Sequence, residues 1–291
     1  MTQKDKIAYS KLYSRFNSRI ERYGQSFFYK VLKSQWTNLK PLLSQYDLSY
    51  ISQNIDSFIS EETFRIALSE FNSKAGEKFL KFYKITTIQK DIQPLQNITI
   101  AFRDAEKIAQ LAKIAQSIEV GEKVTQITET TRKQISDAIN EGLALNKTKA
   151  EIAKDIYNLT GGTIARNRSV TIARTETTYI SSLANEISIS DSPFKYNKIW
   201  IPVRDFRTRQ DHLAMFKHKP IPKEERFNVG GVLMKYPGDP TGGAANVIRC
   251  RCALVYEPIK PDVEEIAPSQ SSGSLLSGIL ISELLAELLK D

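Results

Sequence analysis

The two cysteines of this 291-residue chain, Cys250 and Cys252, stand one residue apart in the stretch NVIRCRCALVYEP. A relaxed disulfide needs Cα atoms roughly 4.4–6.8 Å apart and converging Cβ vectors, and an extended i, i+2 pair meets neither condition comfortably. On a strand, residues i and i+2 project from the same face, so the two sulfurs can reach one point. Three interpretations remain: chance, half of a metal site, or two small apolar residues on one strand face.

A metal site would need further ligands from elsewhere in the chain. A tetrahedral zinc site takes four ligands, commonly thiolate and imidazole. His212 is the obvious third ligand, and Asp205, His218 or water could supply the fourth. The sequence therefore allows a structural zinc site that clamps the segment DFRTRQDH to the last strand. The alternative is two buried, unliganded thiols beside a hydrogen-bonded histidine, because free cysteine is among the most buried residue types.

Charged residues accompany the cysteines and the histidine, and we expect them to form a structural ion-pair network. The members of this network are Arg174, Glu176, Asp205, Arg207, Arg209 and Arg251. Glu176 borders the core side of a predicted helix at about 165–189, and a carboxylate in that position needs a cationic partner. We therefore expect Glu176 to pair with one arginine and Asp205 with another, which would join the helix to the strands.

The same residues allow a catalytic alternative. In a nucleic-acid-processing enzyme or a toxin-like effector, the Glu176/Arg207/His212 cluster would use the histidine as general base and the arginine on a phosphate. The sequence contains no DxD-type metal pair, no glycine-rich phosphate loop and no serine elbow. We therefore favour the structural network and assign no catalytic residue.

The motif residues occur in a fixed order between residues 165 and 257. The series runs Arg174-Thr175-Glu176, Trp200, Asp205, Arg207, Arg209, His212, Phe227, Pro237-Gly238-Asp239-Pro240, Asn246 and Cys250-Arg251-Cys252. This ordered set resembles the phage head morphogenesis family, the minor head proteins similar to protein F of phage Mu. Its members read A-R-T-E, a W, D-x-R-T-R-x-x-H, P-G-D-P and N-x-x-x-C-R-C. The chain departs from that pattern after the histidine, where Met215-Phe216-Lys217 replaces the Leu-Asp-Gly turn of the family.

The resemblance implies a structural protein of a tailed phage or prophage and not an enzyme. Such a protein would act in head assembly, with DNA packaging or delivery as a further role. Its expected partners are the portal protein, the scaffold or the major capsid protein. Its expected location is the virion interior, after assembly in the host cytoplasm.

The elements that must position these residues indicate an α+β fold. A mainly α-helical N-terminal region covers residues 1–160, with helical spacing over 7–36, about 61–84 and about 103–140, and Pro41 is expected to end the first run. A small α+β domain with a short antiparallel sheet covers 161–260. A linker at 261–274 then leads to a C-terminal helix at 275–291.

Local signals within that outline are specific. Thr148 followed by Glu151 predicts a capping box, and Gly161-Gly162 predicts the end of the helix that the box begins. YNKIWIPV is typical of a strand, Gly230-Gly231 of a hairpin turn, and CRCALVYEP of a final strand. Two adjacent thiols are no disulfide framework, so we expect a reducing compartment.

The net charge of +8 is concentrated at the N-terminal end, where residues 1–40 hold nine Lys and Arg against two Asp and Glu. This basic arm predicts non-specific contact with double-stranded DNA through phosphates. The alternative is a solvated basic helix face. The candidate DNA contacts are Lys4, Lys6, Lys11, Arg15, Arg19 and Arg22.

The C-terminal stretch LLSGILISELLAELLK is apolar on almost every side of a helix. Its 16 residues with two glutamates are short for a membrane span. No other stretch reaches that length, and the N-terminus lacks an apolar signal region. We therefore expect a soluble protein whose last helix docks into a partner's groove or onto its own copies. The docking candidates are Leu276, Ile279, Leu280, Leu284 and Leu288.

Overall fold

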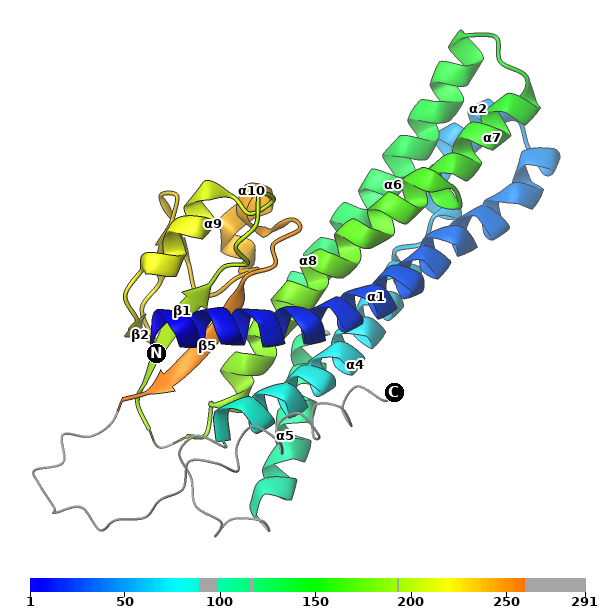
Figure 1. Cartoon of the computed structure of the whole chain (residues 1–291). Coiled ribbons are helices and arrows are strands. Elements are labelled where there is room, and N and C mark those ends of the chain that lie inside the picture. Colours follow the sequence, from blue (N-terminus) through cyan, green and yellow to red (C-terminus); the bar gives the residue numbers. More distant parts are fainter. Residues whose placement is uncertain (89–98, 116–117, 193, 260–291) are drawn as a thin grey trace, which may run out of the picture. The chain divides into compact units, whose positions relative to one another are not determined.

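The computed structural model describes residues 1–88, 99–115, 118–192 and 194–259 (Figure 1). Long helices dominate the N-terminal part of the described chain, and short antiparallel sheets follow after residue 195. The predicted α+β class, mainly helical with a small sheet region, is therefore confirmed. The linker at 261–274 and the helix at 275–291 lie outside the described residues.

The chain divides into two compact units that interleave along the sequence. The first unit consists of Met1–Ser18, Lys74–Leu111 and Thr178–Asp291, and the second of Arg19–Ser73 and Ala112–Thr177. The sequence predicted domains that follow one another along the chain, and this division stays a prediction.

The secondary-structure elements described in the second unit are helices. Its elements are α2 (Leu48–Gln53), α3 (Ile55–Phe58), α6 (Ile118–Ala144), α7 (Lys149–Thr160) and parts of α1 (Gln3–Gln45), α4 (Glu61–Ile88), α5 (Thr99–Ala115) and α8 (Thr163–Ser188). A Cβ atom added at Gly142 of α6 would lie 2.4 Å from the Ile152 side chain of α7, so these two helices pack closely.

The start of α7 follows the predicted capping box. The Thr148 hydroxyl accepts a hydrogen bond from the Glu151 backbone N–H, and the Glu151 carboxylate accepts one from the Thr148 backbone N–H. The helix ends at Thr160, directly before Gly161. Both boundaries could be predicted because each depends on residues within one turn of the helix end.

The expectation that Pro41 ends the first helix is wrong, because α1 continues to Gln45. Proline in a helix interior removes one hydrogen bond and strains the preceding turn. Leu39 and Leu43 flank Pro41 at helical spacing, and both are buried. The burial of these two side chains stabilises the additional helical turn that follows the proline.

The helix expected over about 103–140 is described as two helices, α5 and α6. Residues 116–117 between them lie outside the described part of the chain.

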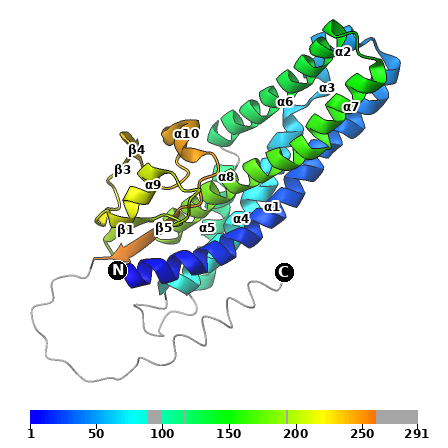
Figure 2. The same cartoon turned by 45° about the horizontal axis from the view of Figure 1, so that its top comes forward.

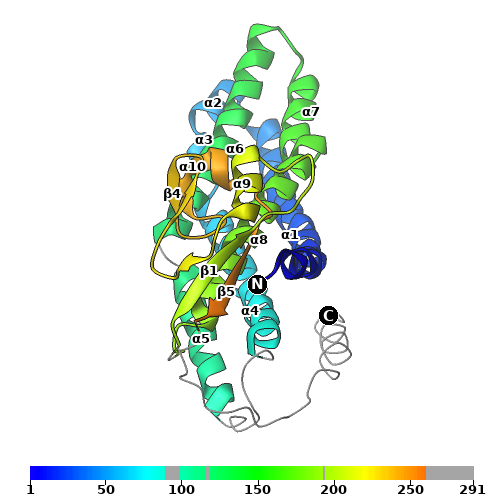
Figure 3. The same ribbon diagram turned by 60° about the vertical axis from the view of Figure 1, so that its left-hand side comes forward.

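The first unit contains the sheet that supports the candidate site. Strands β1 (Tyr196–Ile201), β2 (Ile221–Pro222) and β5 (Ala253–Pro258) pair antiparallel in the order β2-β1-β5, and β1 and β5 lie side by side in Figure 3. The register places Trp200 opposite Leu254 and Ile201 opposite Ala253. The chain directly before β5 is therefore held at the carboxyl end of β1.

The predicted hairpin around Gly230-Gly231 is present (Figure 2). It joins β3 (Phe227–Val229) to β4 (Val232–Met234), and the two turn glycines have φ angles of 59° and 86°. Two successive positive φ values are the signature of a type I′ hairpin turn, which glycine adopts without strain.

Short helices complete the α+β region. These are α9 (Gln210–Ala214), a 3₁₀ turn at Met215–Lys217, a second 3₁₀ turn at Pro240–Gly242, and α10 (Gly243–Val247). The first 3₁₀ turn replaces the Leu-Asp-Gly turn and buries Met215 and Phe216. Across the described residues, no helix has both the length and the apolar character that crossing a bilayer requires.

Candidate functional site

Three side chains of the first unit, His212, Cys250 and Cys252, converge on one point. The His212 Nδ1 atom lies 3.4 Å from the Cys252 sulfur and 3.6 Å from the Cys250 sulfur. The potential ligand atoms all lie within 4.8 Å of one another. His212 is 1% exposed and each cysteine is 2% exposed. The sequence prediction that these three residues meet is thus matched by the geometry.

The histidine and the cysteines come from two separate segments of the chain. His212 lies in α9, and its ring stands almost perpendicular to the Trp200 ring of β1, with centroids 5.5 Å apart. The cysteines occupy the segment before β5, which begins only at Ala253, so the prediction that CRC is part of the final strand is wrong. A turn causes this late start, because Arg249 has a φ angle of 59° and the Cys250 N–H donates to the Val247 carbonyl.

The two thiols differ in their electrostatic surroundings. A hydrogen bond from the Cys252 side chain, helped by His212, holds the pKa of Cys250 well below the usual thiol range despite its burial. Burial, together with the neighbouring Cys250 side chain, raises the pKa of Cys252 well above that range. The two shifts have opposite directions because two adjacent buried negative charges repel each other.

Asp205, the residue expected as a possible fourth ligand, is engaged elsewhere. Both of its carboxylate oxygens accept hydrogen bonds of 2.6 Å from Arg251, and one also accepts from Arg207 at 3.1 Å. Hydrogen bonds from Arg251, with a contribution from Arg207, hold the pKa of this carboxyl far below its usual range. Asp205 therefore anchors Arg251, the residue between the two cysteines.

His218 also lies away from the three converging residues. Its Nδ1 atom is 2.7 Å from the Lys219 carbonyl oxygen, where it donates a hydrogen bond in its Nδ1–H tautomer. Among the described residues, the group with metal-ligating potential consists of His212, Cys250 and Cys252.

Glu176 and Arg174, two further residues of the expected ion-pair network, form ion pairs with residues outside that network. In the second unit, Glu176 forms an ion pair of 3.1 Å with Lys123 of α6, and Arg174 forms one of 3.0 Å with Glu21 of α1. The expectation that Glu176 pairs with an arginine is therefore wrong. Its actual partner comes from a helix more than 50 residues away, which helical spacing around residue 176 could not reveal.

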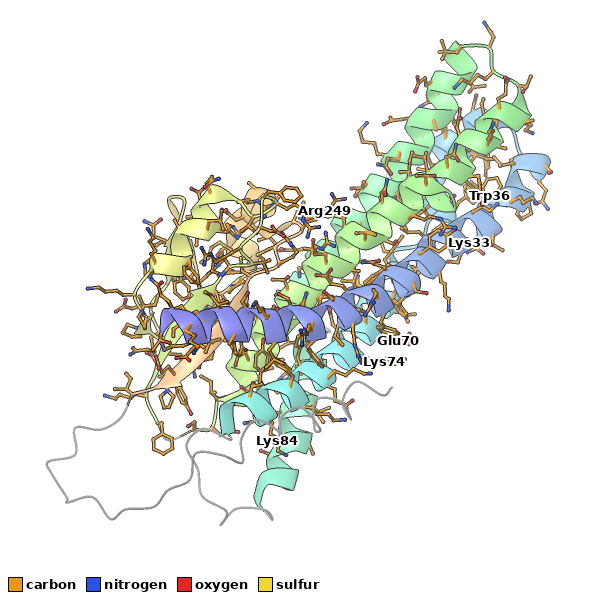
Figure 4. All side chains as sticks on the ribbon, viewed as in Figure 1. Lys33, Trp36, Glu70, Lys74, Lys84 and Arg249 are labelled. Atoms are coloured by element: carbon orange, nitrogen blue, oxygen red, sulfur yellow. The ribbon has the colours of Figure 1, made fainter. Side chains whose placement is uncertain are left out.

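Arg209 does not take part in an ion pair with Asp205. Its guanidinium donates to the Ile248 carbonyl at 2.6 Å. This bond ties the segment before α9 to the chain that leads into the cysteines, and Arg249 in that chain is labelled in Figure 4.

The candidate site lies within a segment that matches a known protein family. Residues 111–255 match the family described as phage Mu protein F like protein. Through this segment, the chain belongs to the Mu F-like family of phage head morphogenesis proteins. The matched range includes Glu176, Asp205, His212 and both cysteines. Comparison with curated proteins and with solved structures returned no match.

The Mu F-like segment also contains a buried cation that the sequence analysis did not single out. Lys198 of β1 is 1% exposed, donates to the Lys235 carbonyl at 2.9 Å, and lies 5.3 Å from the centre of the Phe227 ring. Burial lowers its pKa, while Glu186 opposes that shift. Strand alternation places Lys198 on the same face as Trp200, and this signal could have identified it.

The DNA-contact candidates lie before the Mu F-like segment, on α1. Five of them are exposed: Lys4, Lys11, Arg15, Arg19 and Arg22. Lys6 does not fit the prediction of a DNA contact, because its side chain is buried and its ammonium group donates a hydrogen bond to the Phe216 carbonyl at 3.2 Å. Burial lowers the pKa of Lys6. The docking candidates Leu276, Ile279, Leu280, Leu284 and Leu288 lie outside the described residues.

Proposed function

We propose that this chain is a minor head protein of a tailed phage or prophage. It acts inside the capsid during head assembly, contacts the portal protein, the scaffold or the major capsid protein, and binds double-stranded DNA without sequence preference. The observation that carries this proposal is the Mu F-like match over residues 111–255. The fold adds helix α1, which precedes the matched segment and carries exposed basic residues.

The basic residues of α1 follow its helical repeat. At 100° per residue, six cations fall within about 20° of one line along the helix, and the acidic Asp5 and Glu21 lie about 100° away from it. These six are Lys4, Lys11, Arg15, Arg22, Lys33 and Lys40, all of them exposed. Lys33 is labelled on α1 in Figure 4. Among the described residues, none of the six forms an ion pair, so their charges are available to phosphates.

DNA binding of this kind depends on charge and therefore on salt. Each phosphate contact makes the slope of log affinity against log salt more negative by about 0.9. We expect equal affinities for two unrelated duplexes of the same length, measured by fluorescence anisotropy over a series of salt concentrations. Unequal affinities for the two sequences, or no binding at low salt, would contradict this part of the proposal.

A charge-matched pair of variants locates the surface. Combining Lys11→Gln, Arg15→Gln and Arg22→Gln should make the slope of log affinity against log salt less steep by about 2.7, the value for three lost phosphate contacts. The control combines Lys154→Gln, Lys217→Gln and Lys219→Gln, which removes three exposed charges elsewhere. Both variants have the same net charge, so equal losses of affinity would exclude α1 as the specific contact surface.

The assembly role is tested by counting copies of the chain in purified particles with quantitative mass spectrometry. Copies in mature heads would support an internal minor head protein, and copies in precursor heads alone would support an assembly factor. Absence from both kinds of particle would overturn the proposal. Truncation after residue 274 tests the expected docking helix, because incorporation should fall if residues 275–291 bind a head protein.

The burial of the candidate site supports a structural role over the enzymatic alternative. A general base must reach its substrate within hydrogen-bond distance. His212 is 1% exposed, and the Asp205 carboxylate is occupied by two arginines. The combined variant His212→Ala and Glu176→Ala should therefore reduce stability without removing a nuclease activity. Metal-dependent cleavage of DNA or RNA that disappears in this variant, while the fold remains intact, would instead favour the enzyme.

A further inference from the structure

The two distances from the His212 Nδ1 atom to the cysteine sulfurs match edges of a tetrahedral metal site. With metal–sulfur and metal–nitrogen bonds of about 2.3 and 2.05 Å, tetrahedral angles place each sulfur about 3.6 Å from the nitrogen. The observed distances from Nδ1 to the two sulfurs are 3.4 and 3.6 Å. We infer that these three residues bind a divalent cation that prefers thiolate ligands, with zinc as the expected ion. This inference does not depend on the proposed role in a phage head.

Charge balance is compatible with a cation bound by two thiolates at this position. Two adjacent buried thiolates repel each other, and burial penalises each negative charge. A divalent cation with two thiolates and a neutral imidazole has no net charge, so it satisfies both sulfurs at once. Simple apolar packing of two thiols does not require an imidazole nitrogen to face both sulfurs.

Surrounding contacts hold the ligands in place. The Thr178 hydroxyl donates to the Cys250 carbonyl at 2.5 Å. The two-bond pair of Arg251 with Asp205 fixes the residue between the cysteines. Directly after Cys252, β5 pairs with β1, whose Trp200 packs against the His212 ring. Such supporting contacts orient ligands for a metal and reduce the cost of ordering them when it binds.

Ligand chemistry selects the ion and the fourth ligand. Two thiolates and an imidazole suit zinc, whereas magnesium and calcium prefer oxygen ligands. Asp205 and His218, the other protein candidates, are engaged in the contacts described above, so the described residues supply three of the four ligands of the ion. The ion would connect α9 to the segment before β5, two parts of the chain that are about 40 residues apart. Its role is structural, because metal binding then contributes to folding stability.

The test uses the full-length chain. After removal of metal under reducing conditions, the protein is given zinc or cobalt(II), desalted, and examined by elemental analysis and absorption spectroscopy. We expect one zinc ion per chain and, with cobalt, the intense visible bands of tetrahedral coordination together with thiolate-to-metal charge transfer. Zinc should also raise the melting temperature. A chain that retains no metal after reconstitution, or a cobalt spectrum without thiolate bands, would overturn the inference.

The chain provides its own matched control, because it contains two histidines. His212→Gln should lose metal binding, and His218→Gln should bind one equivalent like the unaltered chain. Cys252→Ser removes one of the two thiolate ligands and should therefore reduce the charge-transfer absorption. If Cys252→Ser fails to fold, the comparison of the two histidine variants still decides the outcome. Metal retained equally by His212→Gln and His218→Gln would assign the ion to another part of the chain.

Discussion

Arg251 and Asp205 form a two-bond ion pair, with both nitrogen–oxygen distances at 2.6 Å. They are 46 residues apart in the sequence. Arg251 separates the two cysteines, and Asp205 lies between β1 and α9. The pair therefore connects the segment that supplies the sulfurs to the segment that leads to the histidine.

Removing the arginine from this pair should destabilise the protein. Arg251→Gln should lower the free energy of unfolding by about 2 kcal/mol, the usual magnitude for losing hydrogen bonds to a charged group. Urea denaturation followed by circular dichroism measures the change. The control is Arg207→Gln, because the Arg207 side chain is 58% exposed and donates a single side-chain bond of 3.1 Å to Asp205. Its cost should stay below about 1 kcal/mol, and equal costs for both variants would contradict the assigned importance of the two-bond pair.

The same pair predicts how acid affects stability. Hydrogen bonds from Arg251 hold the pKa of Asp205 below its usual range in the folded state. A carboxyl with a lowered folded-state pKa stabilises the protein above its unfolded-state pKa of about 4, and this contribution is lost as the pH falls through the folded-state value. The stability difference between the unaltered chain and Asp205→Asn should therefore be largest near neutral pH and shrink below about pH 4. Urea denaturation at several pH values measures it, and a constant difference would contradict the prediction.

The ion pair between Glu176 and Lys123 should couple α8 to α6. The two side chains are 4% and 15% exposed, and their charged atoms are 3.1 Å apart. A double-mutant cycle with Glu176→Ala and Lys123→Ala should give a coupling free energy of about 1–3 kcal/mol, since a buried charge that loses its partner is costly. Thermal or urea denaturation of the four proteins provides the values.

A second ion pair on α6 is the control for that cycle. Lys133 and Asp137 are 2.8 Å apart, but their side chains are 75% and 58% exposed. Water screens such a pair, so its coupling should not exceed about 0.5 kcal/mol. If the exposed pair couples as strongly as the buried one, burial is not what makes the Glu176 pair important.

Features that depend on neighbouring residues could be predicted from the sequence. The capping box of Thr148 and Glu151 requires contacts across three residues, and the hairpin requires two glycines with positive φ angles. The order of the motif residues indicated the family, and the ligand chemistry of zinc indicated that His212 could meet the two cysteines. For the capping box and the hairpin, the chemistry of one short segment restricts the structures that it can form.

Features that depend on distant packing could not be predicted in this way. Lys6 resembles the other basic residues of its helix in sequence, yet it is buried because Phe216, 210 residues later, provides a carbonyl acceptor. The partner of Glu176 comes from α6, and α1 passes Pro41 because Leu39 and Leu43 are buried. Sequence periodicity identifies which face of a helix is apolar, but it does not identify the group that approaches that face.

The turn at Pro237-Gly238-Asp239-Pro240 requires glycine for two reasons, which can be separated experimentally. Gly238 has a φ angle of 84°, and an added Cβ would lie 3.0 Å from the Tyr179 backbone nitrogen of α8. Gly231 has a similar φ angle of 86°, but an added Cβ would have no neighbour within 4 Å. Gly231→Ala should therefore cost only the backbone strain of about 1–2 kcal/mol. Gly238→Ala should cost at least about 1 kcal/mol more, because the turn must also move away from the helix. Urea denaturation of both variants tests this difference, and equal costs would mean that the turn can move away from α8 without loss.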